Sequence, residues 1–111
     1  MDYNPPLLEV FKSATFDKWF SKLRDRQAKA RIAARIDRLA VGNPGDVRPV
    51  GSGVSEMRID YGPGYRVYFT QRGSIVILIL CGGDKRTQDA DIARAIDIAA
   101  SWKGADHGGE S

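Results

Sequence analysis

The sequence predicts an α+β fold in which an antiparallel β-sheet carries helices packed on one face. The main observation is a set of three consecutive segments, 54–61, 65–71 and 74–81, separated by Gly62-Pro63-Gly64 and by Arg72-Gly73. The first two segments alternate polar and apolar residues, which is typical of strands with one buried face. The third is apolar at every position from 75 to 80, as in a central strand that is covered on both sides.

The rest of the chain predicts one further strand and three helices. In chain order these are an edge strand over 7–12, a helix over 16–23 with Thr15 as N-cap, a helix over about 26–41, a loop over 46–52, the three strands, and a helix from Thr87 or Asp89 to about Ala100. The first two helices place apolar residues three and four positions apart, as a helix with one buried stripe requires. The predicted order of elements is therefore β-α-α-β-β-β-α.

Length and composition indicate a single globular domain of 111 residues, 42% hydrophobic and 28% charged. We expect this domain to span 1–103 and to be followed by a disordered polar tail over 104–111, which contains the only histidine, His107. A single cysteine excludes a disulfide framework, and no apolar run approaches the ~20 residues of a membrane helix. Because the N-terminus also lacks a secretory signal, a cytoplasmic protein is expected.

The charge balance favours an anionic partner. The net charge is +3, and the chain has 11 Arg against 6 Lys, the former being better suited to forked contacts with phosphate. Arg31, Arg35 and Arg38 recur along one stripe of the second expected helix. This stripe is either a solvated helix face, whose aliphatic stems cover the core, or a surface that binds phosphate groups.

The motifs exclude several classes of chemistry. The chain has no cluster with metal-ligand spacing, no P-loop and no dinucleotide-binding glycine pattern, so no metal or cofactor is expected. Its serines and its cysteine have no histidine available as a base, which argues against a hydrolase triad. The run Gly82-Gly83-Asp84-Lys85 resembles a phosphate-binding turn, but it could equally be a tight connection between a strand and a helix.

The remaining candidate site is the polar face of the predicted sheet. If Met57 and its apolar neighbours face the core, then Glu56, Arg58, Arg66 and Tyr68 share the opposite face. Arginine and lysine can hold a phosphate and stabilise the charge that develops in its transition state. A carboxylate, tyrosine or lysine could remove the proton of a ribose 2′-OH, so the face suits a phosphodiester substrate. The simpler alternative is a polar face that only covers the sheet.

Four motifs are more specific. They are FDKWF at 16–20, EMRI at 56–59 with GPGYRVYF at 62–69, LCGGDK at 80–85 with TQ at 87–88, and DI at 91–92. Together they resemble the RelE/ParE superfamily of toxins from type II toxin–antitoxin systems, and most closely its HigB-like addiction module killer proteins. The resemblance covers roughly residues 8 to 100.

This resemblance implies a toxin that cuts mRNA in the ribosomal A site, leaves a 2′,3′-cyclic phosphate and is neutralised by a cognate antitoxin. By motif, Arg66 looks like the strand arginine of the family and Arg58 like the basic residue of the preceding strand. Lys85 or Arg86 looks like the basic residue after the last strand. Where RelE has a tyrosine, this chain has Gln88 and two aspartates, so the resemblance leaves the general base open.

We therefore predict an endoribonuclease (mRNA interferase) with mRNA, the ribosome and an antitoxin as partners. The predicted catalytic residues are Arg58, Arg66, Lys85, Glu56 and Tyr68, and the predicted RNA-binding residues are Arg31, Arg35, Arg38, Arg86 and Gln88. The antitoxin is expected on the uncovered polar sheet face or beside the first two helices. The alternatives are a ParE-like inhibitor of DNA gyrase without nuclease activity and an inactive toxin that serves only as the antitoxin's partner.

Overall fold

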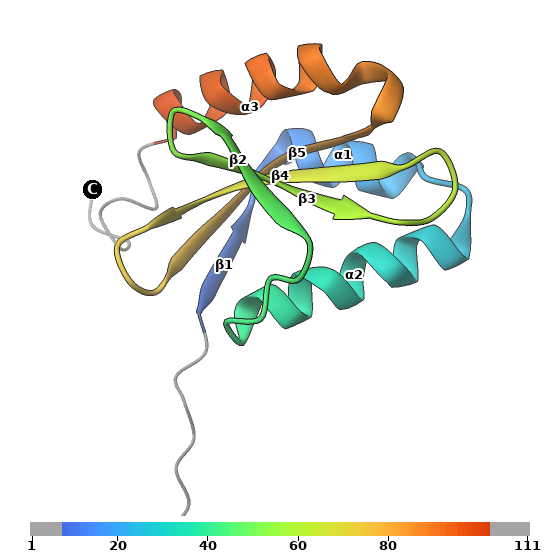
Figure 1. Cartoon of the computed structure of the whole chain (residues 1–111), viewed down its shortest axis with the longest axis horizontal. Coiled ribbons are helices and arrows are strands. Elements are labelled where there is room, and N and C mark those ends of the chain that lie inside the picture. The colour runs from blue at the N-terminus through green and yellow to red at the C-terminus, as the bar shows by residue number, and fades with distance from the viewer. Residues whose placement is uncertain (1–7, 103–111) are drawn as a thin grey trace, which may run out of the picture.

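The computed structural model describes residues 8–102, in which five strands form one sheet and three α-helices pack against it (Figure 1). The elements are β1 (Glu9–Lys12), α1 (Ala14–Lys22), α2 (Arg26–Ala40), β2 (Val47–Gly51), β3 (Val54–Ile59), β4 (Tyr65–Arg72), β5 (Val76–Asp84), a short 3₁₀ turn (Lys85–Thr87) and α3 (Gln88–Ser101). This arrangement confirms the predicted α+β class. The predicted tail and its histidine lie outside the described residues.

The sheet has the strand order β1-β5-β4-β3-β2 and is mixed rather than purely antiparallel. β1 runs parallel to β5, with Glu9 opposite Val76, whereas the other neighbouring pairs are antiparallel. Two strands joined by a short turn must be antiparallel. Two helices and three strands separate β1 from β5 along the chain, so no turn sets the direction of β1 relative to β5. The predicted antiparallel arrangement is wrong for this one pair.

β2 occupies the segment that the sequence predicts as a loop. It pairs with β3 so that Val47 lies opposite Met57, and its register becomes irregular between Pro49 and Gly51. Proline argues against a strand because it lacks an N–H group. β2 is an edge strand, however, and one side of an edge strand needs no partner. The loop prediction over 46–52 is therefore wrong, and β2 is the strand that the predicted order of elements lacks.

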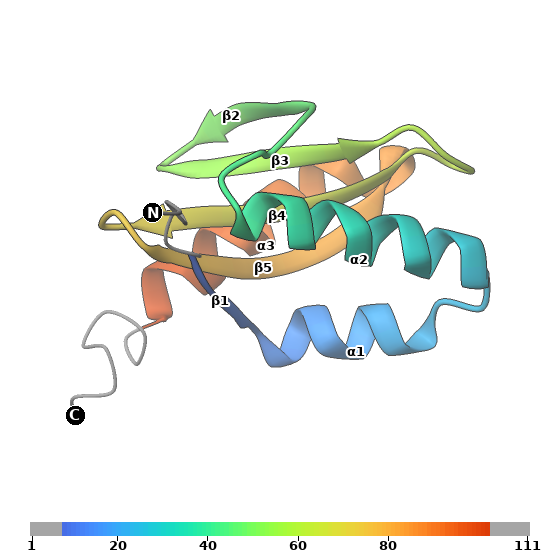
Figure 2. The ribbon, with the colours of Figure 1, turned by 90° about the horizontal axis from the view of Figure 1, so that it is seen from below.

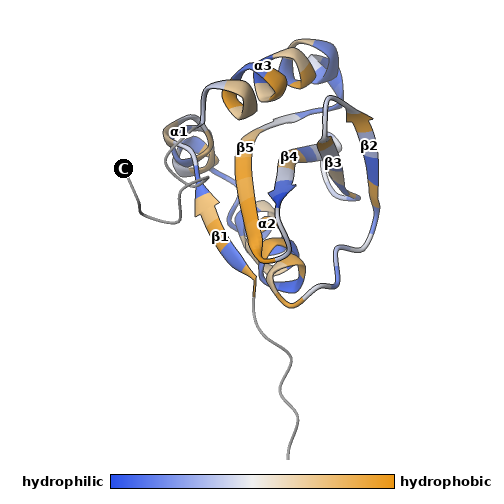
Figure 3. Ribbon diagram, turned by 90° about the vertical axis from the view of Figure 1, so that its left-hand side faces the viewer, coloured by the Kyte–Doolittle hydropathy of each residue, from blue (hydrophilic) through white to orange (hydrophobic). Residues whose placement is uncertain are grey.

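Helices cover both faces of the sheet, so the prediction of helices on one face is wrong. Figure 2 shows α2 in front of the strands, α3 behind them and α1 beside the β5 edge of the sheet. The buried residues on the α1 and α2 side are Phe16, Ile32, Ile36, Leu39, Met57, Ile59, Val67, Phe69, Ile77 and Ile79. Those on the α3 side are Val54, Tyr68, Leu78, Leu80, Cys81, Ala95 and Ala99. β5 supplies residues to both cores, which explains its continuous apolar colour in Figure 3.

Side-chain caps fix the starts of α1 and α2. Ser13, rather than the predicted Thr15, caps α1, because its Oγ accepts a hydrogen bond from the Phe16 N–H at 2.9 Å. The same hydroxyl donates to the Leu80 carbonyl at 2.5 Å and so ties α1 to β5. Asp25 caps α2 by accepting two backbone N–H bonds. Each cap thus provides a hydrogen-bond acceptor for free N–H groups in the first turn of its helix.

Candidate functional site

β3 and β4 bring the predicted polar residues together on one face of the sheet. Glu56 lies opposite Tyr68, and Arg58 lies opposite Arg66. Because alternate residues of a strand face the same side, these four side chains share one face. Glu56 and Tyr68 are fully buried, while the side chain of Arg58 is 39% exposed. The prediction of an uncovered polar face therefore fails at the end that α3 covers and holds at the other end.

The carboxylate of Glu56 is a buried hub for side chains from β2, β4 and α3. Its Oε2 accepts hydrogen bonds from Gln88 Nε2 at 2.7 Å and from the Tyr68 hydroxyl at 3.0 Å. Its Oε1 accepts one from Arg48 Nε at 3.1 Å. Arg66 Nε lies 3.9 Å from Oε2, within ion-pair distance but without a hydrogen bond. Both oxygens of Glu56 are therefore engaged by neighbouring side chains.

These contacts fix the ionisation of the hub. Burial alone would raise the pKa of Glu56, but the hydrogen bonds from Gln88, Tyr68 and Arg48 outweigh it, so the pKa lies below its ordinary value of 4.5. Burial, and then the negative charge of Glu56, raises the pKa of the Tyr68 hydroxyl. At neutral pH the pair is therefore a carboxylate and a neutral phenol. Neither group offers a free acceptor for a substrate proton.

A cavity of about 430 Å³ opens at the uncovered end of the face. Its lining consists of Asp46, Arg58, Ile59, Asp60, Gly64, Arg66 and Lys85. The Arg66 side chain is only 13% exposed, and its Nε has no hydrogen-bond partner within residues 8–102. Three cationic residues predicted from the sequence, Arg58, Arg66 and Lys85, thus line one hollow. A cavity with this lining can accept an anion such as a phosphate group.

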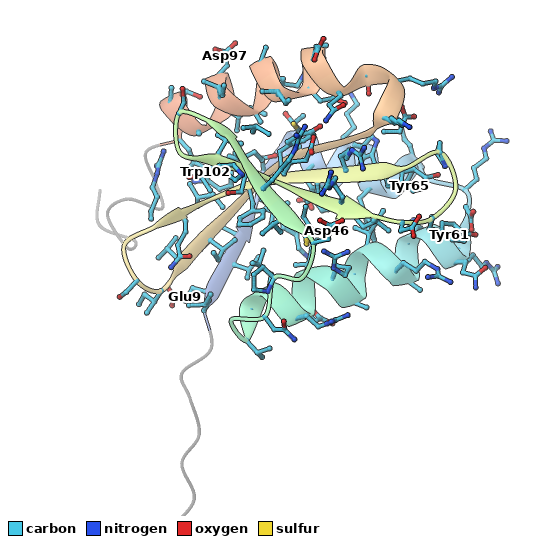
Figure 4. The ribbon with its side chains drawn as sticks, viewed as in Figure 1. Glu9, Asp46, Tyr61, Tyr65, Asp97 and Trp102 are labelled. Carbon is cyan, nitrogen blue, oxygen red and sulfur yellow. The ribbon has the colours of Figure 1, made fainter. Side chains whose placement is uncertain are left out.

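Asp46 lies where α2 and β2 meet, beside the strands of the cavity (Figure 4). Its side chain is 57% exposed, and its Oδ1 accepts a hydrogen bond from Arg58 Nη2 at 2.9 Å. This bond raises the pKa of the Arg58 guanidinium, which stays charged. The Asp46 backbone carbonyl also accepts the Arg58 N–H at 2.9 Å. The segment before β2 is thus joined to β3 at the cavity by both backbone and side chain.

Arg35 supports this segment from α2. Its Nη1 donates to the Arg58 carbonyl at 2.7 Å, and its Nη2 donates to the Pro44 carbonyl at 3.1 Å. Burial lowers the pKa of this guanidinium, although the group remains charged in its ring of carbonyls. The structure therefore gives Arg35, predicted as an RNA-binding residue, a role in holding the wall of the cavity.

Two glycines bring the end of β5 close to both layers of helices. Gly82 and Gly83 lie in β5, and Asp84 and Lys85 lead through the short 3₁₀ turn into α3, so the run is the tight connection between a strand and a helix rather than a phosphate-binding turn. A Cβ atom at Gly82 would lie 2.3 Å from the ring of Trp19, and one at Gly83 would lie 1.8 Å from Asp91 Oδ2. Packing against α1 and α3 therefore requires glycine at both positions. The chain then delivers Lys85 to the cavity.

The other predicted RNA-binding residues differ in their surroundings. Arg31 and Arg38 are exposed on α2 and line a second hollow of about 340 Å³, where the Arg31 guanidinium lies 4.7 Å from the centre of the Tyr61 ring. The Arg86 side chain is 83% exposed. Gln88 instead contributes its amide to the buried hub.

Sequence reasoning missed Asp46 and Arg48, which both lie in the segment predicted as a loop. Without a strand there, no face could be assigned to either side chain. One signal was available: a carboxylate at an alternating strand position beside a buried face needs cationic partners on its neighbours. In the structure Arg48 lies opposite Glu56 and supplies such a partner.

Within residues 8–102, no three His, Cys, Asp or Glu side chains are grouped so that they could hold a metal ion. Over the same range, no helix has the length and apolar character needed to span a membrane.

The fold and the cavity define a small α+β protein with a cationic hollow at one end of its sheet. The chain belongs to the family described as phage derived protein Gp49-like (DUF891), which matches residues 18–102. It is also 50% identical, over 88 residues, to an uncharacterized protein of Haemophilus influenzae; the match covers 79% of this chain and 89% of that protein. The family is phage-derived, toxin-like and related to addiction module killer proteins. The matched range contains every residue that lines the cavity.

Proposed function

We propose that this protein is the toxin of a type II toxin–antitoxin module, a HigB-like member of the RelE/ParE superfamily that cleaves mRNA on the ribosome in the cytoplasm. One observation carries the proposal: Arg58, Arg66 and Lys85 line a single cavity. Cleavage of a phosphodiester by its own 2′-OH concentrates negative charge on the phosphoryl oxygens and the leaving oxygen. Fixed cations at those positions stabilise that charge without further reorganisation.

In this mechanism Arg66 and Arg58 hold the scissile phosphate. Arg66 is the better placed for a fixed geometry, because it is 13% exposed and Glu56 lies beside its Nε. Lys85 lies after the last strand and is exposed, so it can follow the leaving oxygen and supply its proton. Glu56 and Tyr68, predicted as proton-transfer groups, take a positioning role, because the carboxylate is sealed in its hub and the phenol keeps its proton.

The proton acceptor that the geometry favours is Asp46. Its carboxylate lines the same cavity, is more than half exposed and contacts the Arg58 guanidinium. The 2′-OH would give its proton to Asp46 while its oxygen attacks phosphorus. The bond from phosphorus to the 5′-oxygen then breaks, and Lys85 protonates that oxygen. The products are a 2′,3′-cyclic phosphate and a 5′-hydroxyl, so atoms and charge balance.

The partners follow from this role. A toxin needs a cognate antitoxin, and an A-site nuclease needs a surface for ribosomal RNA. Arg31, Arg38 and Arg86 are exposed cations near the cavity side of the molecule and suit phosphate contacts. Because α3 seals half of the polar sheet face, an antitoxin can reach only the open half, where the cavity lies.

The test is primer extension on cellular mRNA after brief induction. We expect wild-type protein to cut inside translated codons, Arg66→Ala to abolish the cuts, and Asp46→Asn to slow them by about 10²- to 10⁴-fold, as loss of a general base does. Asp60→Asn is the matched control, since it removes a second carboxylate from the same cavity. Thermal unfolding of each variant separates lost chemistry from lost folding.

Two outcomes would overturn the proposal. Cuts by Arg66→Ala at the wild-type rate would remove the cavity from the chemistry. Growth arrest with intact mRNA, together with trapped gyrase–DNA complexes, would favour the ParE-like alternative. Loss of cleavage in Asp60→Asn but not in Asp46→Asn would keep the nuclease and transfer the role of proton acceptor to Asp60.

A further inference from the structure

A second basic groove lies between α1 and α3, on the other side of the glycine pair. It is a hollow of about 440 Å³ lined by Thr15, Lys18, Trp19, Lys22, Gly82 and Arg94. Three of these residues are cations and none is acidic. Lys18, Lys22 and Arg94 are exposed and make no ion pair with any residue between 8 and 102. The groove therefore presents three cations that no ion pair with a described residue neutralises.

The walls of this groove are held firmly. Lys18 and Lys22 are one helical turn apart, so they emerge on the same side of α1. Trp19, between them, packs on Gly82, where no side chain would fit, and its ring lies 6.2 Å from that of Tyr65 in an edge-on contact. Arg94 comes from the opposite wall, α3. The aromatic floor is thus fixed, while the cations on both sides stay free to adapt.

The groove is adjacent to the proposed cleavage site along β5. Gly82 lines the groove, and Lys85, three residues later, lines the cavity. Three residues of extended chain span roughly 10 Å, which equals about three stacked nucleotides. A further hollow of about 450 Å³ at Lys85–Ala90 adjoins the cavity through Lys85. A single RNA strand bound in the groove can therefore continue toward the cavity.

We propose that this groove binds the RNA strand next to the scissile phosphate, with a base against Trp19 and phosphates on Lys18, Lys22 and Arg94. Aromatic side chains flanked by cations are how proteins bind single strands without reading their sequence. The inference deepens the proposed function and rests on it, because it assigns a second subsite for the same RNA.

The first experiment uses the fluorescence of Trp19. The chain has two tryptophans, so Trp102→Phe leaves Trp19 as the reporter. We expect a short single-stranded oligouridylate, added at low salt to the folded variant, to quench this fluorescence in a saturable way. Absence of quenching at concentrations that bind the protein would overturn the proposal. Quenching by polyglutamate but not by oligouridylate would also overturn it and would indicate an acidic protein segment as the occupant.

The second experiment measures the salt dependence of oligouridylate binding in two matched double variants. Lys18→Gln/Lys22→Gln removes two charges from the groove, and Arg24→Gln/Arg26→Gln removes two from exposed positions outside it. The first pair is expected to weaken binding and to reduce the slope of log K against log salt by about 0.7 per lost phosphate contact. The second pair is expected to change neither quantity. Equal effects of the two pairs would show only a diffuse positive charge and would contradict a built subsite.

The same variants separate this inference from the proposed function. If the groove is an RNA subsite of a nuclease, the variant Lys18→Gln/Lys22→Gln cuts mRNA more slowly. In the variant Arg66→Ala, oligouridylate still quenches the fluorescence of Trp19, but mRNA is not cut. Cleavage lost in Arg66→Ala with no quenching in any variant would overturn the groove and leave the nuclease. Quenching with no cleavage by the wild type would overturn the nuclease and leave a binding groove for RNA.

Discussion

Glu56 and Arg58 are two residues apart on β3 and face the same side of the sheet, yet they have opposite surroundings. Glu56 is fully buried and engaged by side chains from three other elements. Arg58 borders an open cavity, and its main partner is an exposed carboxylate. The difference arises because α3 covers one end of the face and leaves the other open. Alternation along a strand shows which charges share a face, and the covering helix decides which of them can meet a ligand.

The covered end is expected to carry stability. Glu56→Ala would leave the buried Tyr68 hydroxyl and the Gln88 amide without their acceptor, at a cost of about 1–3 kcal/mol for each unsatisfied group. It would also leave the nearly buried Arg66 without its carboxylate. Urea unfolding measures this loss. Asp60→Ala, which removes an exposed carboxylate from the strand end, is the control and should unfold close to the wild type. Similar midpoints for the two variants would contradict a structural role for the hub.

The pH dependence of stability gives a second test of the hub. The folded-state pKa of Glu56 lies below the ordinary 4.5, so its contribution is fully present above pH 4.5 and is lost as the pH falls through the lower folded value. Wild type and Glu56→Gln should therefore differ in unfolding free energy at neutral pH and converge in acid. Parallel curves across this range would mean that the carboxylate is not stabilised by its partners.

The seam between β5 and α3 is the next most sensitive position. Gly83→Ala would place a Cβ atom 1.8 Å from Asp91 Oδ2, and such overpacking costs about 1–3 kcal/mol. The double variant Gly83→Ala/Asp91→Ala removes the obstructing carboxylate. A double-mutant cycle in thermal unfolding should show strong coupling between the two sites. Simple additivity would indicate that the backbone, rather than this side chain, resists the substitution.

A smaller loss of stability is expected from a substitution of Arg35, which joins α2 to the wall of the cavity. Arg35→Gln would release hydrogen bonds to the carbonyls that hold Asp46 and Arg58 together, at about 1 kcal/mol. We also expect slower mRNA cleavage, because the cavity wall would shift. Arg26→Gln, on the same helix and exposed, is the control. Normal cleavage by Arg35→Gln would show that these hydrogen bonds of Arg35 do not contribute to the site.

The polar site could be predicted from the sequence where alternation and turns were decisive. The glycine turn at 62–64 and the alternation in β3 and β4 predict that Arg58 and Arg66 share one face, and the structure places them opposite each other. The convergence of both with Lys85 followed from the order of the strands.

The remaining features depended on tertiary packing. Pro49 argues against a strand in the sequence, but the missing N–H costs nothing on the open side of an edge strand, and β2, which carries Arg48, is such a strand. The burial of Glu56 and Tyr68 depends on which face α3 covers, and the apolar stripe of a helix does not encode that choice. Two glycines that suggested a phosphate-binding turn are explained instead by contact with Trp19 and Asp91.

We propose that the open end of the sheet performs chemistry that the fold does not need. The most direct measurement is mRNA cleavage in cells by Arg58→Gln, made beside its unfolding free energy. We expect a stably folded protein whose unfolding midpoint is close to that of the wild type and which no longer cuts translated mRNA. A variant that cuts as well as the wild type, or that loses activity only because it unfolds, would contradict the assignment of this end of the sheet as the site.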